Sequence, residues 1–87
     1  MKAAKRVAWH LRRLRVERGL SQESLAVDAD VDVSYISRLE SALENPSIGL
    51  LERLASALGA DVSDMLAVPL RGERQPKPLR SGRKSSS

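Results

Sequence analysis

The chain has 87 residues, of which 41% are hydrophobic and 30% charged, a balance typical of one globular domain. It contains no cysteine, one histidine and two aromatic residues, so aliphatic packing must form the core, while disulfides, thiolate metal sites and histidine-rich zinc sites are excluded. No apolar segment approaches the about 20 residues that span a bilayer, and the first residues lack the apolar stretch of a signal peptide. We therefore expect a cytoplasmic, helical protein with no membrane partner and no metal or other cofactor.

The charged residues are unevenly distributed, although the net charge is only +4. Residues 1–20 contain seven basic residues and one acidic residue, residues 21–67 contain two basic and nine acidic residues, and residues 68–87 contain six basic residues and one acidic residue. Basic segments at the ends of a chain are a common footprint of contact with nucleic-acid phosphates or another anionic surface, and equally a common form of solvated tail. Charge alone leaves both interpretations open.

The first helix is expected in residues 5–19. Val7, Leu11 and Leu14 recur there at spacings of four and three residues, with charged residues between them. This is the pattern of an amphipathic helix, and Gly19 is of the residue type that most often ends one.

Two shorter helices are expected next, separated by a break of about three residues. Ser21 is suited to cap a helix from about residue 21 to residue 28, and Asp32 is suited to cap a helix over residues 33–41. The residues expected to face inward are Leu25 and Ala26 in the second helix, and Ile36, Leu39 and Leu43 in the third.

A fourth and a fifth helix are expected after Pro46, which disfavours a helical residue before it. Ser47 is suited to cap a helix over residues 48–58 that ends at Gly59. A last short helix, from about Ser63 to Ala67, would complete the core before Pro69 ends it; the core residues expected here are Val62, Met65 and Leu66.

From Pro69 onward the composition changes to Pro, Arg, Lys, Gly and Ser. Such a segment cannot bury enough apolar surface to offset the entropy cost of folding. The sequence therefore predicts an all-α, five-helix domain in residues 1–68 and a flexible, disordered basic tail in residues 69–87.

Two short helices joined by a short turn form the arrangement that places one helix in the major groove of DNA. The sequence also carries specific segments in order: LSQE at 20–23, LA at 25–26, YISRLE at 35–40, NPS at 45–47 and LERLA at 51–55. Together these segments resemble the lambda-repressor-like helix-turn-helix family, also called the Cro/repressor or XRE family. The resemblance implies a compact five-helix domain that regulates transcription by binding specific DNA sequences as a homodimer.

The outward face of the third helix is the candidate base-reading surface. With Ile36 and Leu39 buried, the side chains that point away are those of Ser34, Ser37, Arg38 and Ser41, flanked by Val33 and Tyr35. We expect base contacts from Val33, Ser34, Ser37 and Arg38, because Arg38 can donate two hydrogen bonds to a guanine, serine hydroxyls can donate or accept, and valine can pack on a thymine methyl group. The alternative for Arg38 is a solvated surface arginine that pairs with a nearby acid.

The candidate phosphate contacts are Ser21, Gln22, Tyr35, Ser41 and Arg13. Ser21 and Gln22 begin the second helix, where free backbone amides and the positive end of the helix dipole favour a phosphate. The Gln22 contact is also implied by the family resemblance, as is an ion pair between Arg15 and Glu40 that joins the first and third helices.

Four further side chains are assigned no part in DNA contact. His10 is expected to be an ordinary surface side chain, and Trp9, which lies outside the apolar stripe of the first helix, to be partly exposed. Ile48 and Leu50 are not needed for the core face of the fourth helix, and the resemblance implies dimer contacts around the fourth and fifth helices.

The sequence departs from the family pattern at two turns. Asp30 and Ala42 stand where the family usually has glycine, and Leu43 and Glu44 follow where basic residues are frequent. An aspartate can hold a left-handed backbone conformation at some cost. The acids Asp28, Asp30, Asp32 and Glu44 also bring negative charge close to the third helix, which opposes phosphate binding. The spacing of the three aspartates fits a calcium loop poorly, because Val33 occupies the position that requires glycine.

The leading functional interpretation is a transcriptional regulator that binds double-stranded DNA at a palindromic operator, as a homodimer located at the nucleoid and with no small-molecule effector. A restriction-modification controller or an autorepressing antitoxin are alternatives with the same fold. A protein-interaction module that has lost DNA binding is an alternative of another class. We expect no enzymatic activity, because the sequence contains neither a glycine-rich phosphate loop nor a nucleophile placed near a base.

Overall fold

The computed structural model describes residues 2–69, so the predicted tail beyond Pro69 lies outside the described residues. The chain forms five helices in this range and no strand, which confirms the predicted all-α fold. Their bounds are α1 Ala3–Glu17, α2 Gln22–Ala29, α3 Val33–Glu40, α4 Ile48–Leu58 and α5 Val62–Leu66. Each predicted helix is present, with ends that differ from the prediction by at most two residues, and α4 has the predicted ends.

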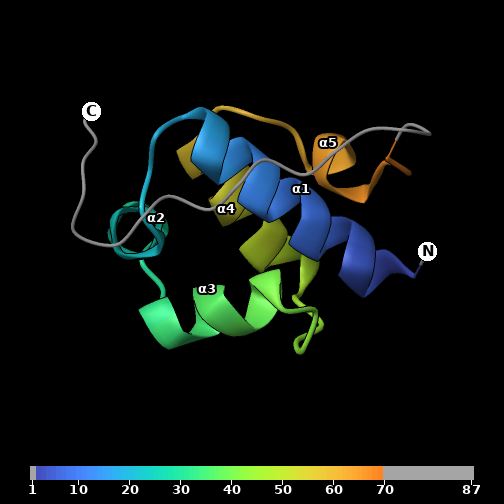
Figure 1. The fold of residues 1–87 in the computed structure, drawn as a ribbon, viewed down its shortest axis with the longest axis horizontal. Helices are drawn as coiled ribbons and strands as arrows, with labels where there is room; N and C mark the ends of the chain where they lie inside the picture. Colours follow the sequence, from blue (N-terminus) through green and yellow to red (C-terminus); the bar gives the residue numbers. More distant parts are fainter. Residues whose placement is uncertain (1, 70–87) are drawn as a thin grey trace.

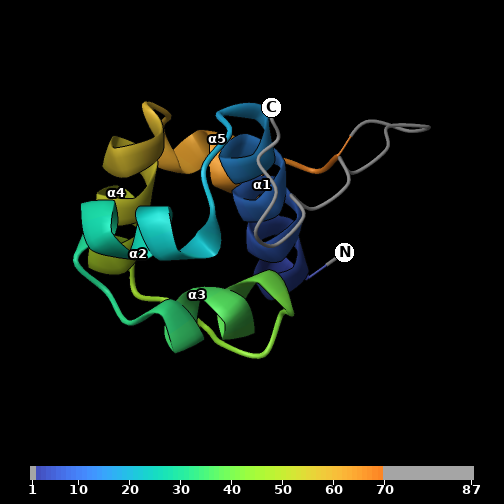
Figure 2. The same cartoon turned by 60° about the vertical axis from the view of Figure 1, so that its left-hand side comes forward.

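Helices α2 and α3 follow each other through a short turn. Helices α1, α4 and α5 lie above α3 in both views (Figures 1 and 2). In both views α3 forms the lower edge of the molecule, so one side of this helix faces inward and the other faces away. Helix α3 is therefore exposed on its outer side, and its inner side packs against the other helices.

The core is aliphatic, as the composition requires. The largest fully buried side chains come from all five helices: Leu11, Leu25, Ile36, Leu39, Leu54, Leu58 and Met65. Val62 and Leu66 of α5 pack against this cluster from its edge. Burial of this kind stabilises a fold by about 1.5–3 kcal/mol for each fully buried large aliphatic side chain.

Side chains cap three of the helices, as predicted. The hydroxyl of Ser21 accepts a hydrogen bond from the Ser24 amide at the start of α2, and the hydroxyl of Ser47 accepts one from the Leu50 amide at the start of α4. The carboxylate of Asp32 accepts a hydrogen bond from the Ser34 amide at the start of α3. Each cap satisfies an amide that has no partner inside its helix.

Four helices end in the same way, with one residue at positive φ. This residue is Gly19 after α1, Asp30 after α2, Ala42 after α3 and Gly59 after α4. The amide of the next residue then donates back to a carbonyl five positions earlier, from Val31 to Ala26 and from Leu43 to Arg38, for example. This is the hydrogen-bond pattern of the Schellman motif, here formed twice without glycine.

The prediction that Leu43 faces inward was wrong. Helix α3 ends at Glu40, and the positive φ of 61° at Ala42 takes the chain out of helical register before it reaches Leu43. The Leu43 side chain is consequently 71% exposed. A helical spacing holds only as far as the helix extends.

The prediction that His10 lies on the surface was also wrong, since this residue is only 5% exposed. The segment after α5 runs back over α1, and the Nε2 of His10 lies 2.8 Å from the carbonyl oxygen of Ala67. The Nδ1 of His10 lies 3.2 Å from Nη2 of Arg13, which can only donate, so the proton of His10 belongs on Nε2. Trp9 is partly exposed, as expected, and its ring packs against both His10 and Arg13.

Candidate nucleic-acid interface

The outer face of α3 is polar and accessible. Ser34, Ser37, Arg38 and Ser41 are all exposed, Val33 is at the margin of exposure, and Tyr35 is half-buried. Ile36 and Leu39, on the opposite face, are buried in the core. The structure therefore brings all the candidate base-reading side chains to one surface, with the inner face of the same helix fixed by apolar packing.

The start of α2 lies next to this surface, because the carboxylate of Glu40 connects the two helices to α1. Arg15 donates to Glu40 from Nε at 2.6 Å and from Nη2 at 3.0 Å. The side-chain amide of Gln22 donates to the same carboxylate at 3.1 Å. Both Arg15 and Glu40 are buried, so Glu40 is a shared acceptor that holds the N-terminus of α2 and the C-terminus of α3 against α1.

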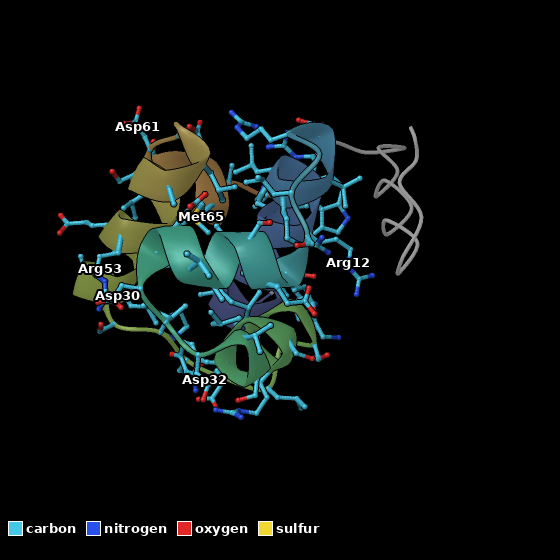
Figure 3. The ribbon with its side chains drawn as sticks, turned by 90° about the vertical axis from the view of Figure 1, so that its left-hand side faces the viewer. Arg12, Asp30, Asp32, Arg53, Asp61 and Met65 are labelled. Atoms are coloured by element: carbon cyan, nitrogen blue, oxygen red, sulfur yellow. The ribbon has the colours of Figure 1, made fainter. Side chains whose placement is uncertain are left out.

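Arg12 is a residue of this region that the sequence did not single out. Its Nε lies 3.6 Å from Oε1 of Glu40 and has no hydrogen-bond partner among the described residues, while its side chain is about one-third exposed. Figure 3 places Arg12 at one end of α2 and the labelled Asp30 and Arg53 at the other. The available signal was its position three residues before Arg15, which puts both side chains on one side of α1.

Arg13, a candidate phosphate contact, is occupied by neighbours within α1. Its Nη1 lies 3.2 Å from a carboxylate oxygen of Glu17, its Nη2 contacts His10, and its guanidinium lies over the ring of Trp9. Contact with a phosphate would have to compete with these interactions.

The turn between α2 and α3 is held from α4. Asp30 has φ 58° and ψ 51°, the left-handed conformation expected where the family has glycine. The guanidinium of Arg53 donates to the carbonyl oxygens of Ala29, at 2.9 Å, and of Asp30, and its Nη2 lies 4.0 Å from the Asp30 carboxylate. Figure 3 shows Arg53 beside Asp30, with Asp32 farther along the chain at the start of α3. Arg53 therefore binds two carbonyls at the C-terminal end of α2, those of its last residue and of its C-cap.

Arg38 interacts with an acid from the loop after α3. Its Nε donates to Oε2 of Glu44 at 2.7 Å, and its guanidinium carbon lies 5.6 Å from the centre of the Tyr35 ring. Both side chains of the ion pair are partly exposed, at 47% for Arg38 and 30% for Glu44. The predicted base-reading arginine thus has a local acidic partner on Nε, and its side chain remains partly exposed.

Three of the four acidic side chains near α3 have local neighbours. Asp32 caps α3, Asp30 lies beside Arg53, and Glu44 binds Arg38. Within residues 2–69 no three acidic or histidine side chains come together in the manner of a metal site. No helix in the same range is long and apolar enough to cross a membrane.

Known proteins share both the sequence pattern and the fold. The model of the helix-turn-helix domain family matches residues 6–68. The chain is similar to the HTH-type transcriptional regulator DdrOP3 of Deinococcus deserti, with 46% identity over 56 residues that make up 64% of this chain and 43% of that protein. It spans between 40% and 59% of the length of three such curated relatives.

Solved structures agree with these sequence matches. The hypothetical transcription factor NHTF from Neisseria is similar with a TM-score of 0.75 and 32% identity, over 78% of each chain. The restriction-modification controller protein C.AhdI from Aeromonas hydrophila is similar with a TM-score of 0.69 and 34% identity, over 71% of this chain and 94% of that one. The chain therefore belongs to the helix-turn-helix domain family, in its lambda-repressor-like (Cro/repressor, XRE) branch.

Proposed function

We propose that this protein is a regulator of transcription that binds a specific, palindromic DNA operator as a homodimer, with α3 in the major groove. The observation that carries the proposal is the outer face of α3, where an exposed arginine and three exposed serines project from a helix whose inner face is buried in the core. A surface of this kind matches the donor and acceptor groups on base edges. Relatives named as transcriptional regulators and a restriction-modification controller support the same function.

In this proposal the side chains divide into two groups. Val33, Ser34, Ser37 and Arg38 contact base edges, and phosphates are bound by Ser21, Gln22, Tyr35, Ser41 and Arg13. The N-terminus of α2 supports phosphate binding. Its first amides point out of the end of the helix, and the helix dipole favours an anion there. Gln22 is held by Glu40, so its remaining polar groups approach a phosphate from a fixed position.

The dimer is supported by an apolar side chain that the fold leaves outside its core. Ile48, at the start of α4, is 64% exposed. Two copies related by a twofold axis would place their α3 helices about 34–36 Å apart, one turn of the DNA double helix. The protein would act at the nucleoid in the cytoplasm, with DNA and a second copy of the chain as its partners.

The test is a selection from random DNA duplexes with the purified full chain at near-physiological salt, followed by sequencing of the bound DNA. We expect an enriched inverted repeat with half-sites one helical turn apart. Enrichment of a single half-site would contradict the dimer, and no enrichment would contradict sequence-specific binding. The Ser37→Glu variant should lose the enrichment, because it places a negative charge on the outer face of α3.

The matched control is Ser56→Glu, which adds the same charge to an exposed position on α4. Its selected sequences should match those of the wild type. Equal losses of enrichment in the two variants would mean that an added negative charge weakens DNA binding wherever it is placed. Helix α3 would then have no special role in recognition.

A further inference from the structure

Arg38 has its guanidinium placed by two contacts from different parts of the chain. Glu44 accepts a hydrogen bond from Nε at 2.7 Å, and the ring of Tyr35, one turn earlier on α3, lies against the guanidinium at 5.6 Å. The hydrogen bond turns the Nε edge of the planar group toward the loop, and the ring lies close to the guanidinium carbon. The hydrogen bond to Glu44 comes from Nε and does not use the two terminal nitrogens of Arg38.

The Glu44 contact depends on the turn that follows α3. Arg38 and Glu44 are six residues apart, so they cannot meet as neighbours on one helix. The positive φ of Ala42 and the hydrogen bond from the Leu43 amide to the Arg38 carbonyl bring the chain back toward α3. This reversal places the Glu44 carboxylate beside the arginine.

The stability of the fold does not explain why an acid stands at position 44. An ion pair between partly exposed side chains contributes little to folding, and a carboxylate beside a DNA-binding helix repels phosphates. The geometry instead favours a role in recognition. An arginine that contacts guanine with its two terminal nitrogens must hold its plane in line with the base, and a carboxylate on Nε fixes that plane before binding.

We propose that Glu44 is a positioning residue that determines base specificity by orienting Arg38 toward a guanine edge. The inference depends on the proposed role of Arg38 in reading a base. Glu44 itself touches no base in this arrangement. It reduces the number of Arg38 conformations, so that the terminal nitrogens face O6 and N7 of one guanine and favour that base pair over the others.

The test measures binding of the full chain to its selected operator, to operators changed at each base pair, and to random duplexes. The variants are Arg38→Ala, Glu44→Gln and the double variant, with circular dichroism to confirm folding. Arg38→Ala should lower discrimination at one base pair by about 10- to 100-fold. Glu44→Gln should lower discrimination at that same base pair while binding to random duplexes becomes equal or tighter, because a repulsive charge is removed. The double variant should show the preference of Arg38→Ala with no further decrease.

Glu52→Gln is the matched control, since it removes the same charge from an exposed position on α4. It should leave the preference at every base pair unchanged. This control separates a general gain in affinity, caused by lower negative charge, from a change in base reading.

The possible results separate the two proposals. If Arg38→Ala alters one base preference and Glu44→Gln does not, Arg38 reads a base and the role of Glu44 is overturned. If Glu44→Gln increases the preference at that base pair, Glu44 competes with DNA for Arg38, and its positioning role is again overturned. If neither variant alters any preference, or no operator is selected at all, the base-reading role of Arg38 fails and the role of Glu44 fails with it.

Discussion

At the scale of single residues, the carboxylate of Glu40 is a buried charge that depends on its partners for stabilisation. It is 6% exposed and accepts hydrogen bonds from Arg15 and Gln22, with Arg12 close by. Removing one partner of a buried ion pair leaves the other charge without compensation in a poorly solvated place. Because Arg15 is itself only 3% exposed, it cannot recover water by a small movement.

We therefore expect Glu40→Gln to lower the free energy of unfolding by about 3 kcal/mol, measured by urea denaturation followed with circular dichroism. The control is Glu17→Gln, which removes the acid of an exposed i,i+4 pair with Arg13 and should cost about 0.5 kcal/mol or less. Similar small costs in both variants would show that Glu40 contributes no more than a surface ion pair.

At the scale of elements, the turns on either side of α3 decide where its outer face points. Asp30 precedes it and Ala42 follows it, both with positive φ, and the family usually has glycine at both positions. At Asp30 the backbone carbonyls are bound by Arg53, whereas Ala42 has only the hydrogen bonds of the helix end. This conformation costs an L-residue about 1–2 kcal/mol, which makes Ala42 a place where the fold carries strain.

Ala42→Gly should therefore raise the free energy of unfolding by about 0.5–1 kcal/mol, because the relief of strain exceeds the extra entropy that glycine has in the unfolded chain. Thermal denaturation would measure the change. The same substitution inside α4, Ala57→Gly, should lower stability by about 1 kcal/mol, since the backbone there is helical. A decrease in stability at both positions would contradict strain at Ala42.

At the scale of the whole molecule, the charged residues are divided between an acidic middle and basic ends. The described domain contains the acidic part of the sequence, and residues 68–87 contain six basic residues and one acidic residue. Basic side chains that neutralise phosphates release counterions, so their contribution depends on salt and not on base sequence. The domain would then supply specificity, and the basic segment would supply affinity for any duplex.

Deleting residues 69–87 should weaken binding to operator and random DNA by a similar factor, with the operator sequence preference retained. The slope of log affinity against log salt concentration should become shallower by about 0.9 for each phosphate that the tail neutralises in the full chain. Binding measured over a salt series would determine this slope. An unchanged slope would show that the tail does not bind phosphate, and a changed base preference would show that it reads sequence.

The sequence by itself determined the parts of this protein that depend on local interactions. Hydrophobic spacing predicted five helices, and Ser21, Asp32 and Ser47 predicted the starts of three of them, because a cap involves residues only a few positions apart. The same spacing placed Ser34, Ser37 and Arg38 on the outward face of α3, since a buried stripe defines the opposite side of a helix.

Only the tertiary structure decided the contacts between distant segments. The burial of His10 requires the segment after α5 to cross α1, and the support of the α2–α3 turn requires Arg53 of α4 to reach it. The exposure of Leu43 and the pairing of Arg38 with Glu44 both follow from where α3 ends and how the chain turns there. Helical periodicity carries no information about these events, because the first two depend on how the helices pack and the last two on where a helix ends.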